Sequence, residues 1–260
     1  MKMLASLFVL LPVVAWAQAP FDGTWVTRPD TIKISGKPDV YLVQDGIFTC
    51  AACVPELKIK ADGSEQKVTG HAYYDTASVR VIDAQSIEFI THAAGKLANK
   101  QTLTVSADGK TMKDEFVDYT GTSPAGGTVA YTRVAAGPAG AHALSGSWRT
   151  NGEGSEFSSD LLTVTYKETS DGLTMSTPTG QSYDAKFDGK EYLTAGDPGK
   201  TMVSLKRIDA HTIQETDSRQ GKVTDIIRFK LSDDGRVIRA VDEDKARGTT
   251  MSFMMERKPT

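Results

Sequence analysis

The sequence predicts an all-β protein made of two tandem, small antiparallel barrels, each a meander of hairpins. Three observations lead to this fold class. One sequence unit occurs twice at a fixed spacing, apolar and polar residues alternate with a period of two, and Asp-Gly pairs separate the alternating runs. A pair of β-sandwiches is the alternative, because it would produce the same alternation and the same turns.

The repeat is long and regular. Residues 45–112 align without a gap on residues 171–238, so the spacing is 126 positions throughout. The clearest match is Val81-Ile82-Asp83-Ala84-Gln85-Ser86-Ile87-Glu88 with Arg207-Ile208-Asp209-Ala210-His211-Thr212-Ile213-Gln214, which we interpret as a turn between two strands. A fixed offset over this length indicates an internal duplication.

Domain boundaries follow from the repeat. We expect a first barrel repeat at residues 18–134 and a second at residues 144–260. Residues 135–143 contain only small residues, Pro138 and His142, and we interpret them as a linker. Each copy is long enough for one modest hydrophobic core.

Alternation within each copy predicts strands with one buried and one solvated face. In one such run Leu162, Val164 and Tyr166 alternate with threonines. This period is typical of antiparallel sheets. Asp-Gly pairs such as Asp45-Gly46 and Asp234-Gly235 follow the runs, and tight hairpin turns favour this pair because they require positive φ.

The N-terminus has the features of a secretory signal peptide at residues 1–17. Lys2 precedes an apolar run, and Ala15-Trp16-Ala17 then supplies an A-x-A cleavage pattern. We therefore expect an exported bacterial protein, periplasmic or extracellular, and an uncleaved N-terminal anchor is the competing interpretation. No later stretch is long and apolar enough to suggest an integral membrane segment in the mature chain.

Charge and motifs exclude several classes of function. The formal net charge is −3, and no basic cluster exceeds the pair Lys206-Arg207, so no surface for nucleic acid is predicted. The sequence has no phosphate-binding glycine loop, no G-x-S-x-G and no H-E-x-x-H. We therefore expect no cofactor, and a non-catalytic role is favoured while catalysis stays open.

Each copy begins with a tryptophan motif. Gly23-Thr24-Trp25 and Gly146-Ser147-Trp148 resemble the G-x-W of lipocalins and related calycin barrels. In that family the Trp closes one end of the barrel, and an Arg near the last strand packs across it. The resemblance therefore implies a barrel-closing role for Trp25 and Trp148, with Arg133 and Arg257 as the arginines.

Two further blocks extend this resemblance. Asp188-Gly189-Lys190-Glu191-Tyr192 and Val203-Ser204-Leu205-Lys206-Arg207-Ile208-Asp209-Ala210 are similar to segments of exported, lipocalin-like bacterial proteins of unassigned function. Calycin barrels mostly bind small apolar molecules. The resemblance thus implies a possible small apolar ligand as an analogy from the fold.

Cys50 and Cys53 are the only cysteines of the chain. In an oxidising compartment such a pair predicts a disulfide. A redox-active or metal-binding C-x-x-C is the alternative. The cysteines align with Ser176 and Thr179 in the second copy, which favours a local staple specific to the first copy.

His71 lies beside Tyr73 and Tyr74, in a polar-aromatic group that could line a barrel mouth. These three residues are the candidate ligand-binding residues, and the alternative is an ordinary surface loop. No set of His and Cys has metal-ligand spacing, so no metal site is predicted. The acidic run Asp242-Glu243-Asp244 is interpreted as a solvated strand end.

Three functions are consistent with these observations. The first is an exported protein whose barrels bind small apolar or amphipathic molecules at their mouths. The second is a structural or protein-interaction module of the cell envelope that uses sheet faces or edges. The third is an enzyme working in a barrel mouth, with the same His71, Tyr73 and Tyr74 as its first candidates.

Overall fold

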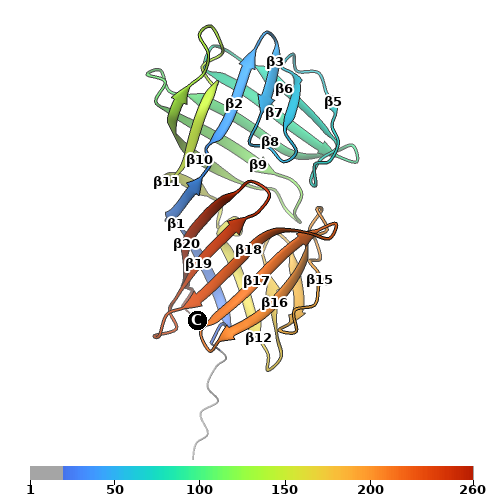
Figure 1. The fold of residues 1–260 in the computed structure, drawn as a ribbon, viewed down its shortest axis with the longest axis vertical. Helices are drawn as coiled ribbons and strands as arrows, with labels where there is room; N and C mark the ends of the chain where they lie inside the picture. Colours follow the sequence, from blue (N-terminus) through green and yellow to red (C-terminus); the bar gives the residue numbers. More distant parts are fainter. Residues whose placement is uncertain (1–19, 260) are drawn as a thin grey trace, which may run out of the picture.

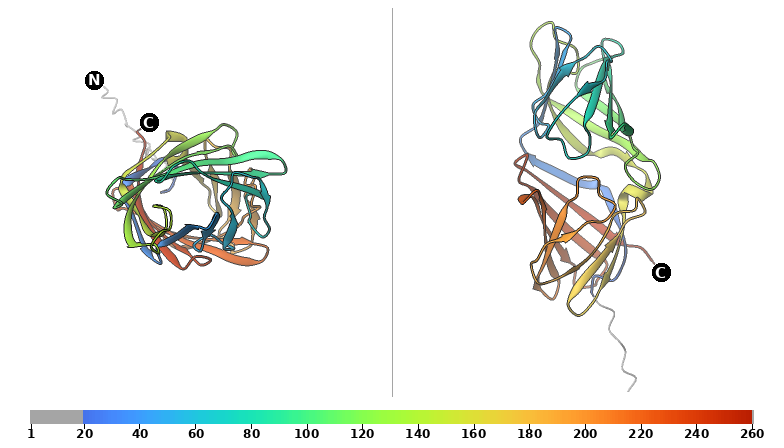
Figure 2. Two further views of the ribbon diagram at one scale, coloured as in Figure 1. Left: turned by 90° about the horizontal axis from the view of Figure 1, so that it is seen from above. Right: turned by 90° about the vertical axis from the view of Figure 1, so that its right-hand side faces the viewer.

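The structure, a computed structural model, describes residues 20–259 of the chain, and the predicted signal peptide at residues 1–17 lies outside them. The described chain has one short helix and two ten-stranded antiparallel sheets. Each sheet curls into a nearly closed barrel, and from above the strands form a ring (Figure 1, Figure 2). The predicted fold class of two tandem antiparallel barrels is confirmed.

We call the sheet of β2 to β11 barrel 1; its strand order is β4-β3-β2-β11-β10-β9-β8-β7-β6-β5. The strands are β2 (Asp39–Gln44), β3 (Ile47–Cys50), β4 (Leu57–Lys60), β5 (Gln66–Lys67), β6 (Thr76–Val81), β7 (Ser86–Ala93), β8 (Lys96–Val105), β9 (Thr111–Asp118), β10 (Ala125–Ala136) and β11 (Gly146–Phe157). The end strands of this sheet are β4 and β5. An isolated bridge between Asp62 and Arg80 connects the segment after β4 to β6.

Barrel 2 is the other sheet, in the order β14-β13-β12-β1-β20-β19-β18-β17-β16-β15. Its strands are β1 (Gly23–Gly36), β12 (Thr163–Glu168), β13 (Gly172–Ser176), β14 (Ser182–Lys186), β15 (Tyr192–Leu193), β16 (Met202–Asp209), β17 (Thr212–Arg219), β18 (Lys222–Leu231), β19 (Val237–Asp244) and β20 (Thr249–Arg257). The helix α1 (Ser159–Leu162) connects β11 to β12.

The two repeats exchange their first strands. β1 lies between β12 and β20 of the second repeat, with Trp25 opposite both Val164 and Arg257. In return β11 lies between β2 and β10 of the first repeat, with Trp148 opposite Asp39 and Arg133. Figure 1 shows the blue strand β1 in the lower barrel, whose other strands are yellow to red.

This exchange corrects the predicted domain boundaries. The repeats at residues 18–134 and 144–260 do not coincide with the barrels, because each barrel takes its first strand from the other repeat. The predicted linker at residues 135–143 does not join the barrels either. It connects β10 to β11 within barrel 1, and β10 extends through Ala136. The chain passes between barrels at Lys37-Pro38 and at α1.

Turns form where the sequence predicts them, at Asp-Gly pairs and at the repeated Ile-Asp-Ala block. Asp45 and Gly46 both have positive φ, at 52° and 72°, and form the two-residue turn between β2 and β3. The repeated Ile-Asp-Ala block forms the predicted turn in both copies. Asp83 Oδ1 accepts the backbone N–H of Gln85 at 2.9 Å, and Asp209 Oδ1 accepts that of His211 at 2.8 Å.

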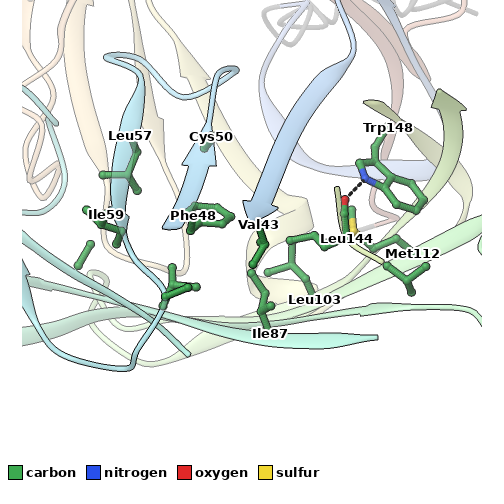
Figure 3. Close-up of a cluster of buried hydrophobic side chains, with 14 of the residues drawn as sticks. Val43, Phe48, Cys50, Leu57, Ile59, Ile87, Leu103, Met112, Leu144 and Trp148 are labelled. Carbon is green, nitrogen blue, oxygen red and sulfur yellow. Dashed lines mark hydrogen bonds between the residues drawn. The ribbon is translucent and has the colours of Figure 1, made fainter. Parts of the chain in front are cut away.

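Each barrel contains a packed Trp–Arg pair. The Arg133 guanidinium carbon lies 4.0 Å from the centre of the Trp148 ring, and that of Arg257 lies 4.2 Å from the Trp25 ring. Both indoles are fully buried and donate to a backbone carbonyl four residues earlier. Trp148 donates to Leu144 (Figure 3), and Trp25 donates to Phe21. Each pair therefore joins residues from two different repeats.

The same arginines donate hydrogen bonds to backbone carbonyls. Arg133 donates to the carbonyls of Ser145 at 2.8 Å and Ala143 at 2.6 Å, so it binds the segment that enters β11. Arg257 donates to the carbonyls of Pro20 and Gly235, each at 2.7 Å. Because buried carbonyls need donors, each guanidinium stabilises the backbone it binds as well as covering the indole.

Candidate functional site

A cavity of about 880 Å³ lies where the open ends of the two barrels face each other. Its inner wall comes from barrel 1, and its opposite side comes from strand ends and loops of barrel 2. The lining includes Tyr41, Phe48, Phe89, Leu103, Asp114 and Tyr131 on the inner wall, and on the opposite side Arg219, Asp225 and Asp244 from strands and Pro198, Lys200 and Arg247 from loops. The volume is within the range of small-molecule sites.

An unbroken series of aromatic rings follows the barrel 1 wall. His71 stacks on Tyr74 with ring centres 4.5 Å apart, and Tyr74 meets Phe89 edge-on at 6.5 Å. Phe89 then contacts Phe48 at 5.9 Å, and Phe48 stacks on Tyr41 at 6.2 Å. Aromatic rings at these separations attract one another and present a large apolar surface. The wall suits a ligand with an apolar or aromatic body.

The three candidate residues predicted from the sequence all line this cavity, but they differ in their contacts. His71 and Tyr74 belong to the aromatic series. Tyr73 instead faces barrel 2, where the Arg219 guanidinium carbon lies 5.1 Å from its ring centre. Ligand binding by these residues stays a prediction.

Burial affects the ionisation of the same residues. It lowers the pKa of the His71 imidazole, so the ring is neutral at pH 7. It raises the pKa of the Tyr74 hydroxyl to about 12. Burial, followed by the nearby Asp197, also raises the pKa of Tyr73. This part of the wall is therefore uncharged at neutral pH.

Cys50 and Cys53 form the predicted disulfide, with Cα atoms 5.4 Å apart. Cys50 ends β3 and is buried, and both cysteines lie on the cavity wall. The disulfide thus fixes the loop after β3 at the rim of the cavity. Among residues 20–259, no group of three or more His, Cys, Asp and Glu side chains could hold a metal ion.

Two carboxyl groups of barrel 1 line the cavity, and only one of them has an ion-pair partner. Asp39 forms an ion pair with Arg247 from barrel 2, and this pair opposes the rise in pKa that burial causes at Asp39. Asp114 is only 8% exposed, and its Oδ1 atom has no hydrogen-bond partner. Burial, together with the neighbouring Glu115, raises the pKa of Asp114 to about 7.

Barrel 2 carries a group of buried carboxyls where barrel 1 has its aromatic wall. Tyr183 donates a hydrogen bond of 2.6 Å to Glu215, and both side chains are buried. Asp217 and Asp242 lie nearby, each with an unpaired Oδ1 atom. Burial raises the pKa of Glu215 and of Asp217 well above their ordinary values, and it raises that of Asp242 to about 6.

Sequence reasoning missed several of these residues. Asp114 occupies an inward position of β9, between the inward residue Met112 and Phe116. An acidic residue in the buried register of an alternating strand was an available signal. The acidic run at residues 242–244 is not simply a solvated strand end, because the Oδ1 atom of Asp242 is buried within the barrel.

The fold and its cavity define a tandem β-barrel protein with a central cavity between two barrel mouths. Comparison with protein-family models, with curated proteins and with solved structures finds no match for this chain. Within the part of the chain that the structure describes, no helix is long and apolar enough to span a membrane. The function is therefore argued from the cavity itself.

Proposed function

We propose that the protein binds a small amphipathic molecule in the cavity of barrel 1, outside the cytoplasm. One observation carries this proposal: a cavity of about 880 Å³ runs along an aromatic wall and ends at charged loops. An apolar body would cover the rings of Phe48, Phe89 and Tyr74, and polar groups would meet charged side chains. The A-x-A pattern and the disulfide support export.

A difference between the two barrels supports a site in barrel 1. At the positions of Leu57 and Phe89, barrel 2 has Tyr183 and Glu215, which are joined by a hydrogen bond in its interior. This buried, mutually bonded polar pair occupies the interior of barrel 2 where barrel 1 presents an apolar wall. The aromatic residues that line the cavity come from barrel 1, which supports a ligand site on that side, and barrel 2 supplies the residues opposite.

The test is a titration with N-phenyl-1-naphthylamine, an uncharged dye whose fluorescence rises in apolar surroundings. We expect saturable binding to the wild-type protein. Gln101→Trp places a large side chain on the inward face of β8, where Gln101 lines the cavity, and should weaken dye binding at least about tenfold by occupying the space.

Thr104→Trp is the matched control, because Thr104 is an exposed residue of the same strand. It should leave dye affinity unchanged, and circular dichroism should show the same sheet content in both variants. If the dye does not saturate, or if the two variants behave alike, the cavity is not a ligand site and the proposal fails.

A further inference from the structure

Asp114 is a buried acidic residue of barrel 1 whose carboxyl group has an oxygen without a hydrogen-bond partner. It projects inward from β9, with Leu103 of β8 and Val129 of β10 as its ladder neighbours. The side chain lines the cavity, the residue is 8% exposed, and Oδ1 has no hydrogen-bond partner. An ionised carboxyl in such a position is costly unless a partner compensates it.

The protein does not supply that partner. In the described part of the chain no basic side chain forms an ion pair with Asp114, whereas Asp39 has Arg247. The nearest charged influence is Glu115, which is also acidic and disfavours the ionised form further. Asp114 therefore lines the cavity without a positive group beside it, although one would stabilise its ionised form.

Aromatic residues surround the same space. Tyr41, Phe48, Phe89 and Tyr131 line the cavity together with Asp114. The faces of aromatic rings attract cations, and this attraction is strongest where water is excluded. A buried carboxylate among aromatic rings is thus complementary to an organic cation, and it is unfavourable for an anion.

The two arginines at the mouth do not present an equivalent need, and the third basic lining residue, Lys200, is exposed to solvent. Arg247 pairs with Asp39, and Arg219 donates to the Thr201 hydroxyl at 2.9 Å while it covers Tyr73. Asp225 and Asp244 lie beside them on the cavity lining. Because each arginine already has a partner, an anionic ligand would have to break existing contacts to bind there.

We propose that the ligand of barrel 1 is an organic cation, a protonated amine or a quaternary ammonium on an apolar body, whose charged group contacts Asp114. This inference rests on the proposed function and names its class of ligand. The charged group enters the barrel toward Asp114, and the apolar body lies along Phe48, Phe89 and Tyr74. The carboxylate supplies charge and the rings supply both apolar contact and cation attraction.

The experiment displaces N-phenyl-1-naphthylamine with three molecules that share one alkyl chain: decyltrimethylammonium, decan-1-ol and decanoate. For the wild-type protein we expect the cation to displace the dye at a concentration at least about tenfold lower than the alcohol, and decanoate to be weakest. Asp114→Asn keeps the shape and removes the charge. It should bring the cation and the alcohol to within about twofold of each other.

Glu115→Gln is the matched control, because it removes an equal charge from the exposed face of the same strand. It should keep the preference for the cation. Equal displacement by cation and alcohol in the wild type, or equal effects of the two variants, would overturn the inference. In both cases dye binding remains, so the proposed function stands; loss of dye binding to the wild type would instead remove the proposed function.

Discussion

The two barrels have the same frame and different interiors. Both have ten antiparallel strands, an Asp-Gly hairpin and a Trp–Arg pair, and these features lie at corresponding places of the repeat. Inside, Leu57 and Phe89 of barrel 1 correspond to Tyr183 and Glu215 of barrel 2. The frame depends on what the copies share, and the cavity depends on where they differ.

The two barrels also differ in how their buried polar side chains are hydrogen-bonded. In barrel 2, Glu215 is 9% exposed and satisfied by the hydroxyl of Tyr183, so the polar pair belongs to the core. In barrel 1, Asp114 replaces the Ala240 of the second copy, lines the cavity and has an unpaired, buried oxygen. A satisfied buried pair specifies packing, while an unsatisfied group on the cavity lining is open to a ligand. Asp217 and Asp242 of barrel 2 also have an unpaired oxygen, but neither lines this cavity.

One of the two largest expected effects tests the shared frame. Trp25→Ala and Trp148→Ala should each destabilise the protein by about 3–5 kcal/mol, because each removes a fully buried indole. Although Trp25 precedes all strands of barrel 1, its loss should raise hydrogen exchange in β12 to β20. Trp148→Ala should raise it in β2 to β10.

Hydrogen exchange is measured by mass spectrometry on peptides from each barrel, so that the effect of each variant can be assigned to barrel 1 or barrel 2. Trp25→Phe and Trp148→Phe, which keep an aromatic ring, should give smaller effects in the same barrels. Faster exchange in β2 to β10 after Trp25→Ala would contradict the exchange of first strands.

The second expected effect concerns pH and the carboxyls of barrel 2. Their pKa values are raised on folding, so the folded state binds more protons than the unfolded state between about pH 4 and neutrality. Stability is therefore greatest below the unfolded pKa and falls as pH rises through the folded values. From pH 5 to pH 8 we expect barrel 2 to lose on the order of 5 kcal/mol, because three carboxyls titrate over this range and each pKa unit corresponds to about 1.4 kcal/mol.

Denaturant unfolding at pH 5, 6, 7 and 8, with exchange read in each barrel, measures this loss. Glu215→Gln should flatten the pH profile of barrel 2. Barrel 1 should lose less over the same range, because Asp114, with a pKa of about 7, is the buried carboxyl that titrates there without a partner. A profile that is steeper in barrel 1 would reverse the comparison.

The smallest expected effect concerns the disulfide, which the second copy lacks. Replacing Cys50 and Cys53 together by serine should destabilise barrel 1 by about 2 kcal/mol or less, because the closed loop is short. Exchange in barrel 2 should not change. Wild-type protein under reducing conditions is the control, and it should match the double variant; a loss larger than that of Trp148→Ala would show that the pair does more than fix one loop.

Much of the frame could be predicted from the sequence because its signals are local. Alternation, Asp-Gly turns and the G-x-W motifs each depend on a few adjacent residues, and the disulfide joins residues three positions apart. The exchange of first strands could not be predicted in this way. Trp25 and Trp148 lie in equivalent motifs, so either strand offers similar residues to either barrel.

The connection after β1 gives a physical reason for the exchange. Only Lys37 and Pro38 separate β1 from β2, and the residue before a proline favours an extended backbone. An extended connection carries the chain onward into the other barrel, whereas pairing β1 with β2 would require a reversal there. The cavity was partly predictable: its histidine and tyrosines were singled out, but Asp114 requires knowing which face of β9 is inward.

The exchange of first strands also orders events as the chain is made. Barrel 1 needs only residues 39–157, so all of its strands exist before half of barrel 2 has been synthesised. β1 is made first, yet its neighbour β20 ends at Arg257. One edge of β1 can pair with β12 once residue 168 is made, but its other edge waits for β20. We therefore expect barrel 1 to fold early, and contacts this distant in sequence form slowly. One edge of the earliest strand of the protein is then among the last to be paired.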